Sequence, residues 1–276
     1  MSGVEQTWKQ RWKDIGPHIG LILFSLFIGL PPLWVLRTSF VPDEVAYKAE
    51  LLPAFTWDNY TKLFSKHQFG LAYFDSFIAA AGSTLIALPL AAMVGYAFAR
   101  HRTGGATARF IVLATQMLPP VAIVLPFFSL FRVFALTNSI LGLIIAYAAI
   151  NLPFLIWILM GFFEGVPVEM EWACEVDGGT PWDAFWRVLI PVSLPGIAAA
   201  GVLGFILAWN EFLFALVLTG PTTMTVPVSL AALQSQNGVQ IAEVSAGVVL
   251  GVAPLLLASR FIQSHLVTGL TFGAVK

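Results

Sequence analysis

The chain has 276 residues, a formal net charge of −1 and a mean hydropathy of +0.84, with 58% hydrophobic and only 11% charged side chains. So few polar side chains cannot cover the surface of a water-soluble domain of this length. The composition therefore excludes a soluble globular protein and indicates an all-α integral membrane protein.

Six apolar stretches have lengths near the roughly 20 residues that cross a bilayer core. They cover residues 15–36, 77–99, 110–131, 140–163, 192–218 and 241–262. We therefore expect one transmembrane domain over residues 1–276, with six transmembrane helices and no separate soluble domain. The basic segment before the first stretch is interpreted as the flank of an uncleaved first helix, because no small-residue cleavage site follows it.

Lysine and arginine set the expected orientation, because the short cytoplasmic loops of membrane proteins carry an excess of both. With both termini in the cytoplasm, nine of these residues lie inside and five lie outside. The inside residues are Lys9, Arg11, Lys13, Arg100, Arg102, Arg109, Arg187, Arg260 and Lys276. The loop between the fourth and fifth helices, 164–191, then faces the cytoplasm.

Prolines interrupt most of these stretches. They stand at Pro89, Pro119, Pro120, Pro126, Pro153, Pro195 and Pro254. Breaks in a membrane helix persist only where neighbouring helices or an aqueous cavity bind the freed backbone groups, so we expect partners around this chain. Gly247 and Gly251 form a small-xxx-small pair, which indicates either close helix packing or the ordinary glycine content of a membrane helix.

The loop 164–191 is the most informative segment, since it carries six of the fifteen acidic residues. Pro167 suits the first turn of a helix, and Glu171 lies near the positive end of the helix dipole. Gly178 and Gly179 end that helix where the chain must turn. We expect a first helix of about ten residues between the proline and the glycines.

A second helix start follows directly. Thr180 is a hydroxyl N-cap, Pro181 suits the first position, and Asp183 stands three residues after the cap. An apolar stripe at helical spacing would lie on the membrane surface or on the protein's own helices. Its members are Trp182, Phe185, Trp186 and Leu189. A plain amphipathic interfacial helix without a partner is the simpler alternative.

One set of loop residues carries a family resemblance: Glu171, Ala173, Asp177, Gly178, Thr180, Pro181, Val188, Ile190 and Pro191. They resemble the EAA loop of bacterial ABC-importer permeases, in the version found in maltose-type sugar and polyol uptake systems. Trp172, Cys174 and Gly179 depart from the usual pattern. The resemblance implies a cytoplasmic coupling helix between helices 4 and 5. It would dock on an ATPase through Glu171, Trp172, Ala173, Cys174, Asp177, Gly178 and Gly179.

The resemblance extends along nearly the whole chain. Further matching segments are 75–76, 95–100, 209–212 and 269–276. The last of them, GLTFGAVK, is similar to the C-terminus of the second permease of heterodimeric sugar importers, which reaches into the ATPase dimer. It implies a tail contact through Gly269, Leu270, Thr271 and Lys276.

Motifs for enzymatic chemistry are missing from the sequence. No glycine-rich run ends in a lysine followed by Ser or Thr, so there is no P-loop. The four histidines form no HExxH, no GxSxG elbow is present, and the single Cys174 excludes an internal disulfide. We expect no metal or cofactor in this chain. The resemblance implies that partner subunits bind ATP and Mg.

Glu211 is the only carboxylate far inside an apolar stretch. An acid at the centre of a membrane helix costs about 2.5–3.5 kcal/mol, so this side chain should face protein or water. Together with Trp209 and Asn210 it offers an aromatic face and hydrogen-bonding groups to a carbohydrate, although packing between helices explains it equally well. Tyr147 and Asn151 form a second polar group beside a proline that breaks the helix.

These features together predict a permease subunit of an ATP-driven ABC importer for a sugar or polyol, in the bacterial cytoplasmic (inner) membrane. The implied partners are a second homologous permease, two ATP-binding subunits, a periplasmic or lipid-anchored solute-binding protein, the substrate and membrane lipid, but no nucleic acid. A secondary carrier driven by an ion gradient is the alternative, although such carriers usually show internal repeats and intramembrane ionisable relays. The missing motifs disfavour a membrane enzyme.

Overall fold

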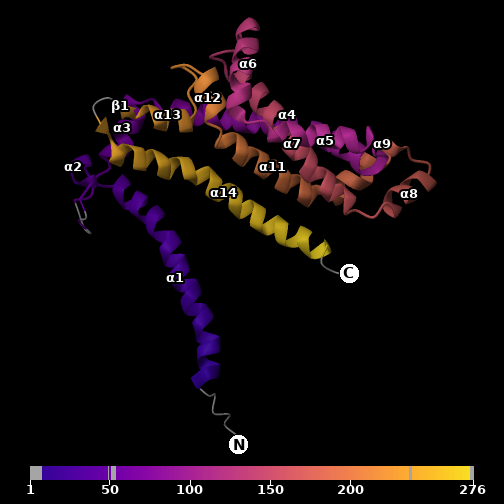
Figure 1. Ribbon diagram of the computed structural model, residues 1–276, viewed down its shortest axis with the longest axis horizontal. Coiled ribbons are helices and arrows are strands. Elements are labelled where there is room, and N and C mark those ends of the chain that lie inside the picture. Colours follow the sequence, from indigo (N-terminus) through magenta and orange to yellow (C-terminus); the bar gives the residue numbers. More distant parts are fainter. Residues whose placement is uncertain (1–7, 49, 51–53, 236–237, 274–276) are drawn as a thin grey trace, which may run out of the picture. The chain divides into compact units, whose positions relative to one another are not determined.

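The computed structural model is almost entirely helical, as the composition predicts (Figure 1). It describes residues 8–48, 50, 54–235 and 238–273, and the side chains within these ranges except those of 8–14, 234–235, 238–239 and 261–273. The helices are α1 Trp8–Ser39, α2 Asp43–Ala46, α3 Asp58–Lys66, α4 Phe69–His101, α5 Gly105–Met117, α6 Pro120–Val133, α7 Ile140–Glu164, α8 Glu169–Val176, α9 Pro181–Asp183, the π-helical turn η1 Ala184–Leu189, α10 Ile190–Val192, α11 Leu194–Trp209, α12 Leu213–Leu218, α13 Val226–Ala232 and α14 Ile241–Gly273. The short strands β1 Gln234–Ser235 and β2 Gly238–Val239 pair antiparallel.

The chain forms two compact units. The smaller unit comprises residues 1–67 and 233–250, and the larger one comprises residues 68–232 and 251–276. Both units contribute to α14, because the division falls within that helix.

Four of the described helices are long and apolar enough to cross a membrane as single spans. They are Ile15–Ser39 within α1, Phe69–His101, Ile140–Glu164 and Ile241–Arg260 within α14. These match the expected first, second, fourth and sixth spans, although α4 begins earlier than expected and α14 continues to Gly273. The described part of the chain contains up to six spans if each of two bent helix pairs counts as one.

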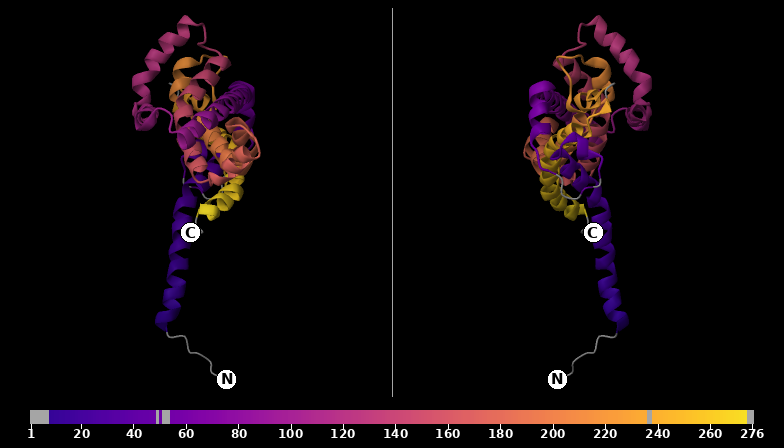
Figure 2. Two further views of the ribbon diagram at one scale, coloured as in Figure 1. Left: turned by 90° about the vertical axis from the view of Figure 1, so that its right-hand side faces the viewer. Right: turned by 90° about the vertical axis from the view of Figure 1, so that its left-hand side faces the viewer.

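The expected third span, 110–131, is not a single straight helix. Its residues are divided between α5 and α6, whose axes differ by 93° (Figure 2). Leu118 has the extended conformation with φ −69° and ψ 126°, because a residue before proline is disfavoured in the helical region. Pro119 is extended as well, and Pro120 then starts α6. Two consecutive prolines therefore turn α6 away from the axis of α5.

The expected fifth span, 192–218, is also broken. A bend of 76° separates the helical segment Pro181–Val192 from α11. A second interruption lies at residues 210–212, between the end of α11 and the start of α12. The apolar composition alone did not predict these breaks, because hydropathy measures the length of a stretch and not the continuity of its backbone.

Four of the single prolines, in contrast, do not break their helices. Pro89, Pro126, Pro153 and Pro254 lie inside α4, α6, α7 and α14 respectively. The broken helix expected around Tyr147 and Asn151 is therefore wrong, since α7 is continuous from Ile140 to Glu164. An isolated proline removes one backbone hydrogen bond and bends a helix, and a membrane helix tolerates this where its neighbours rebind the freed group.

The core of the larger unit is built by α4, α7 and α11, which lie side by side (Figure 1). Small residues on α4 permit the close approach. A Cβ atom added at Gly95 would lie 3.1 Å from the backbone nitrogen of Met160 on α7. Leu155, Leu159 and Phe163 of α7 are fully buried in this core. The α4–α7 pair is therefore a rigid base for the loop that follows α7.

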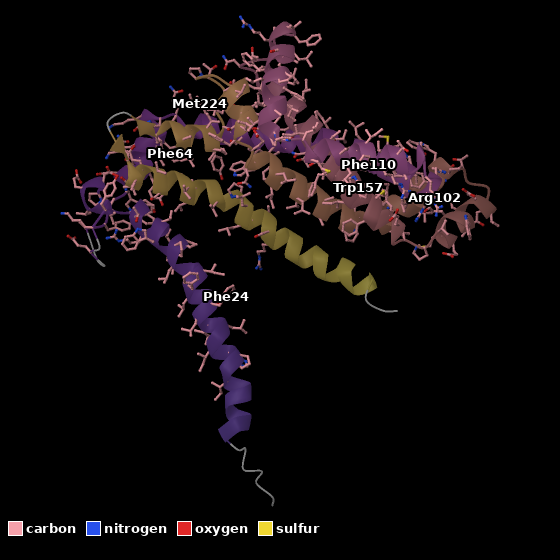
Figure 3. The ribbon with its side chains drawn as sticks, viewed as in Figure 1. Phe24, Phe64, Arg102, Phe110, Trp157 and Met224 are labelled. Carbon is pink, nitrogen blue, oxygen red and sulfur yellow. The ribbon has the colours of Figure 1, made fainter. Side chains whose placement is uncertain are left out.

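The smaller unit is organised around the end of α1. None of the side chains in the most apolar part of α1 is buried within the chain, and Phe24 is one that projects from it (Figure 3). After α1, Asn59 on α3 donates hydrogen bonds to the carbonyls of Ser39 and Val41, at 2.9 and 2.8 Å. An apolar helix of this length is suited to crossing the hydrocarbon core of a bilayer.

Candidate functional site

The loop 164–191 is folded into α8, α9, η1 and α10 at one end of the α4–α7–α11 core (Figure 1). Arg102, which follows α4, lies at the same end (Figure 3). The first loop helix, α8, has 8 residues and is slightly shorter than expected. Its α-helical hydrogen bonding begins with the bond from Trp172 N to Val168 O. Pro167 therefore precedes the helix instead of lying within it.

The two glycines end α8 for different physical reasons. Gly178 has φ +89°, a backbone conformation that side chains rarely adopt, and no other part of the described chain lies within 4 Å of a Cβ at this position. A Cβ at Gly179 would lie 2.7 Å from Cys174 Sγ and 2.8 Å from the Cys174 carbonyl. Gly178 therefore makes the turn, and Gly179 allows the chain to pass close to α8.

The second helix start has the expected capping box. The backbone N–H of Asp183 donates to Thr180 Oγ1 at 3.2 Å, and the N–H of Thr180 donates to Asp183 Oδ2 at 3.0 Å. The apolar stripe that follows is divided between two environments. Phe185 and Leu189 are fully buried, whereas Trp182 and Trp186 remain 57% and 47% exposed. Half of the stripe thus packs on the protein's own helices.

Glu171 is the one predicted docking residue that points into the protein. Its carboxylate is buried and receives hydrogen bonds from Arg100 Nε at 2.5 Å and from the Tyr96 hydroxyl at 3.2 Å. Both donors come from the end of α4. In this conformation Glu171 is engaged within the chain. The sequence did not predict the ion pair between Arg100 and Glu171, because the two residues lie 71 positions apart.

The other predicted docking residues form the outer surface of the loop. Trp172 is 55% exposed, and Ala173, Asp177 and Gly178 are exposed as well. Cys174 and Gly179 are half-buried. We call the six residues Trp172, Ala173, Cys174, Asp177, Gly178 and Gly179 the outer α8 face. It is apolar at its centre and carries an acid at its C-terminal end.

The predicted tail residues lie at the end of α14. Gly269, Leu270 and Thr271 belong to its last turns, where the structure describes the backbone only. Lys276 lies outside the described residues.

Within the broken fifth stretch, Glu211 caps α12. Its two carboxylate oxygens accept hydrogen bonds from the backbone N–H groups of Phe214, at 3.0 Å, and Ala215, at 3.1 Å. The Tyr147 hydroxyl on α7 lies 3.5 Å from the Glu211 carbonyl oxygen. The Glu211 carboxylate is thus bound by backbone N–H groups of the first turn of α12, and packing within the chain accounts for these bonds.

The aromatic face expected at Trp209 is covered. Trp209 is 3% exposed, and its Nε1 donates to the Gly251 carbonyl at 3.0 Å. Phe205 stacks on the indole with ring centroids 5.8 Å apart, and Tyr73 meets it edge-on at 5.2 Å. In this conformation the indole is therefore a packing element. A single aromatic residue in a sequence does not reveal what will cover its face.

The neighbouring polar groups are distributed differently. The Asn210 amide is exposed and donates to the Ile206 carbonyl at 2.8 Å. Tyr147 is fully buried, and Asn151, one turn further along α7, is half-buried. Among the described side chains, no three His, Cys, Asp or Glu residues lie close enough together to hold a metal ion.

The sequence is similar to several transport permeases along most of its length. It is 35% identical to the trehalose transport system permease protein SugB of Mycobacterium tuberculosis, over 92% of this chain and 96% of that protein. It is 32% identical to the sulfoquinovosyl glycerol transport system permease protein SmoH of Agrobacterium fabrum, over 93% and 90%. It is 30% identical to the trehalose/maltose transport system permease protein MalG of Thermococcus litoralis, over 94% and 95%.

The fold is that of a solved importer. A bacterial ABC transporter involved in the import of the acidic polysaccharide alginate contains a chain that superimposes with a TM-score of 0.78, covering 95% of this chain and 99% of that one at 21% identity. The family model for the binding-protein-dependent transport system inner membrane component matches residues 87–271, which include the whole loop 164–191. The chain therefore belongs to the family of inner-membrane permease components of binding-protein-dependent ABC importers.

Proposed function

We propose that this chain carries a sugar or polyol across the bacterial inner membrane, in a complex with a second permease and two ATPase subunits that bind ATP and Mg. A periplasmic or lipid-anchored binding protein delivers the substrate. Similarity to permeases named for trehalose, maltose and sulfoquinovosyl glycerol transport supports the substrate class. A related alginate transporter is described in complex with a substrate-bound periplasmic protein. None of these relatives favours the alternative of a secondary carrier.

The observation that carries the proposal is the construction of the loop 164–191. Its outer α8 face is exposed, whereas its inner side is bound to α4 through Glu171. An exposed docking surface that is firmly attached to the membrane helices is suited to transmit the movement of a bound partner to those helices. In the complex, the outer α8 face contacts an ATPase subunit, and the α14 tail at Gly269, Leu270, Thr271 and Lys276 adds a second contact.

Substitution of Gly178 tests the docking surface, because a side chain there meets nothing in the described chain and would therefore meet a docked partner. In the permease co-expressed with its ATPase subunits, Gly178→Asp is expected to abolish co-purification of the ATPase and ATP-dependent uptake. The matched control is Gly105→Asp. Gly105 also has a positive φ, +62°, and no atom within 4 Å of its Cβ, but it lies outside the loop.

Gly105→Asp also places an aspartate at a positive φ and adds the same charge, so it is expected to leave the ATPase bound. Both variants should melt at similar temperatures as isolated permeases. Normal ATPase co-purification with Gly178→Asp would refute docking on the outer α8 face.

The substrate path is proposed to run past the interruption at residues 210–212. Non-helical backbone within an apolar stretch occurs only where protein or a water-filled cavity binds the freed peptide groups. The exposed Asn210 amide and the half-buried Glu211 provide the hydrogen-bonding groups at this point, with Tyr147 and Asn151 on the facing part of α7. Trp209 supports the site by packing.

A further inference from the structure

Two side chains at the end of α4 hold the loop 164–191. Tyr96 and Arg100 stand one helical turn apart and therefore share a face of α4. Arg100 Nη2 donates to the Val166 carbonyl at 2.8 Å, just before α8, and its Nε bonds to Glu171 within α8. The Tyr96 hydroxyl bonds to Glu171 and lies 3.4 Å from the Pro181 carbonyl at the start of α9. Together they contact the loop before, within and after α8.

The Arg100–Glu171 ion pair is buried, with side-chain exposures of 11% and 6%. A buried carboxylate that loses its cation remains uncompensated in a low-dielectric site, so such a pair opens rarely. The same loop also contains an exposed pair, Arg187 and Asp183, whose arginine side chain is 77% exposed. Exposed pairs of this kind contribute little to stability. The two pairs therefore provide an internal comparison.

Tyr96 and Arg100, with the Glu171 carboxylate that they bind, form a clamp that is connected to the core on both sides. The Tyr96 ring packs on Phe185 of η1 with centroids 4.9 Å apart, and Phe185 is itself fully buried. On the opposite side, Gly95 brings α4 into backbone contact with Met160 of α7. Side-chain contacts thus join α8 to α4 and, through α4, to α7, in addition to the short chain connection between α7 and α8.

We infer that Tyr96 and Arg100 are positioning residues that make α8 and the end of α4 move as one body when a cytoplasmic partner acts on the loop. Both side chains bind the Glu171 carboxylate, which explains why this acid is turned inward and not toward the outer α8 face. The inference rests on the proposed function, since it takes the ATPase to be the partner that moves α8. The contacts themselves do not depend on that assignment.

Hydrogen–deuterium exchange of the permease–ATPase complex tests both parts of this inference. Without nucleotide, Arg100→Gln is expected to raise amide exchange in 169–176 by roughly 100-fold or more, since it leaves a buried carboxylate without its cation. Arg187→Gln, the same substitution at the exposed pair, should change exchange in this segment by less than about threefold. Equal exchange in both variants would refute the clamp.

Two further variants distinguish the loss of these specific contacts from general misfolding of the permease. Tyr96→Phe retains the ring against Phe185 but removes the hydroxyl that bonds to Glu171, so α8 exchange should rise by about tenfold. The double variant Arg100→Gln with Glu171→Gln has no buried charge and should exchange more slowly than Arg100→Gln alone. If the double variant exchanges as fast as the single one, the ion pair is not what holds α8.

Transmission is measured by adding a non-hydrolysable ATP analogue with Mg. In the wild-type complex the analogue should alter exchange both in 169–176 and in the last turns of α4, residues 90–101. In Tyr96→Phe and Arg100→Gln the response of α8 should persist while that of α4 is reduced, which a purely structural role would not produce. An unchanged α4 response in both variants would overturn the transmission step. No response of α8 in the wild type would instead contradict the proposed ATPase docking.

Discussion

At the scale of single residues, Glu211 illustrates how a costly side chain is accommodated. Its carboxylate is satisfied by the N-terminal N–H groups of α12, Phe214 and Ala215. Glu211→Ala removes both acceptors, so we expect a loss of about 0.5–2 kcal/mol of stability, comparable to the loss of an N-cap side chain. Glu211→Gln keeps one acceptor and should lose less. The melting temperature of the solubilised permease checks this order.

Uptake kinetics of the same variants decide whether Glu211 also lines the substrate path. If it does, Glu211→Gln should alter the uptake rate or the range of sugars accepted while the complex assembles normally. A lower melting temperature with unaltered uptake would confine Glu211 to packing.

Glu243 is a second buried carboxylate with partners inside the chain, and it lies in the smaller unit. It lies in the first turn of α14, and its side chain is only 7% exposed. Lys62 Nζ and His67 Nε2 approach its oxygens at 3.6 and 3.1 Å. Because both partners still reach solvent, with side-chain exposures of 38% for Lys62 and 33% for His67, Glu243→Gln should destabilise by about 1–2 kcal/mol, less than the full cost of breaking a buried pair. Thermal melting measures the effect, with the exposed Glu44→Gln as control. Equal melting temperatures would show that the cluster contributes nothing.

Residue-level interpretation of the sequence succeeded where the signal was local. The capping box of Thr180 and Asp183 and the glycine turn at Gly178 depend on groups within a few positions of each other. The orientation of Glu171 depends on Arg100, which is distant in sequence, so its local pattern was equally compatible with an outward-facing acid. The sequence did not predict that the face of Trp209 is covered, because Tyr73 and Gly251, which contact it, are also distant in sequence.

At the scale of elements, the close packing of α4 on α7 depends on Gly95. A Cβ there would lie 3.1 Å from Met160 N and 3.4 Å from the Ile156 carbonyl, and backbone atoms cannot easily retreat. Gly95→Ala should therefore cost about 1–3 kcal/mol through overpacking, despite the better helix propensity of alanine. Gly161→Ala on α7 is the control, because no atom of the described chain lies within 4 Å of its Cβ. A destabilisation by Gly161→Ala as large as that by Gly95→Ala would contradict this explanation.

Hydropathy predicted where apolar segments begin and end better than it predicted their shape. The expected stretch 140–163 and the helix Ile140–Glu164 nearly coincide. The stretch 110–131 is bent after Leu118, and the stretch 192–218 is interrupted at residues 210–212, because the backbone geometry at these positions overrides a uniformly apolar composition. The consecutive prolines Pro119 and Pro120 redirect the chain, whereas Pro31 and Pro32 lie inside the continuous helix α1, so the presence of a proline pair does not by itself predict a break.

At the scale of the whole molecule, the arginine and lysine distribution predicts that the loop 164–191 and both termini lie in the cytoplasm. The single cysteine makes this testable, because Cys174→Ser gives a cysteine-free background. In that background, Val133→Cys lies at the exposed end of α6, where Val133 is 81% exposed, and should react with a membrane-impermeant thiol reagent added to spheroplasts. Asp177→Cys, on the exposed loop, should react only after the membrane is permeabilised.

The comparison is informative because both positions are exposed within the chain, so a difference in labelling reports the side of the membrane and not local burial. The permease is expressed without its ATPase subunits for this assay, because a docked ATPase would cover Asp177 on the outer α8 face. Labelling of Asp177→Cys in sealed spheroplasts would place the loop outside, where no ATPase can reach it. The orientation, the docking proposal and the transmission through Tyr96 and Arg100 would then fail together, since all three require the outer α8 face to lie on the side where ATP is bound.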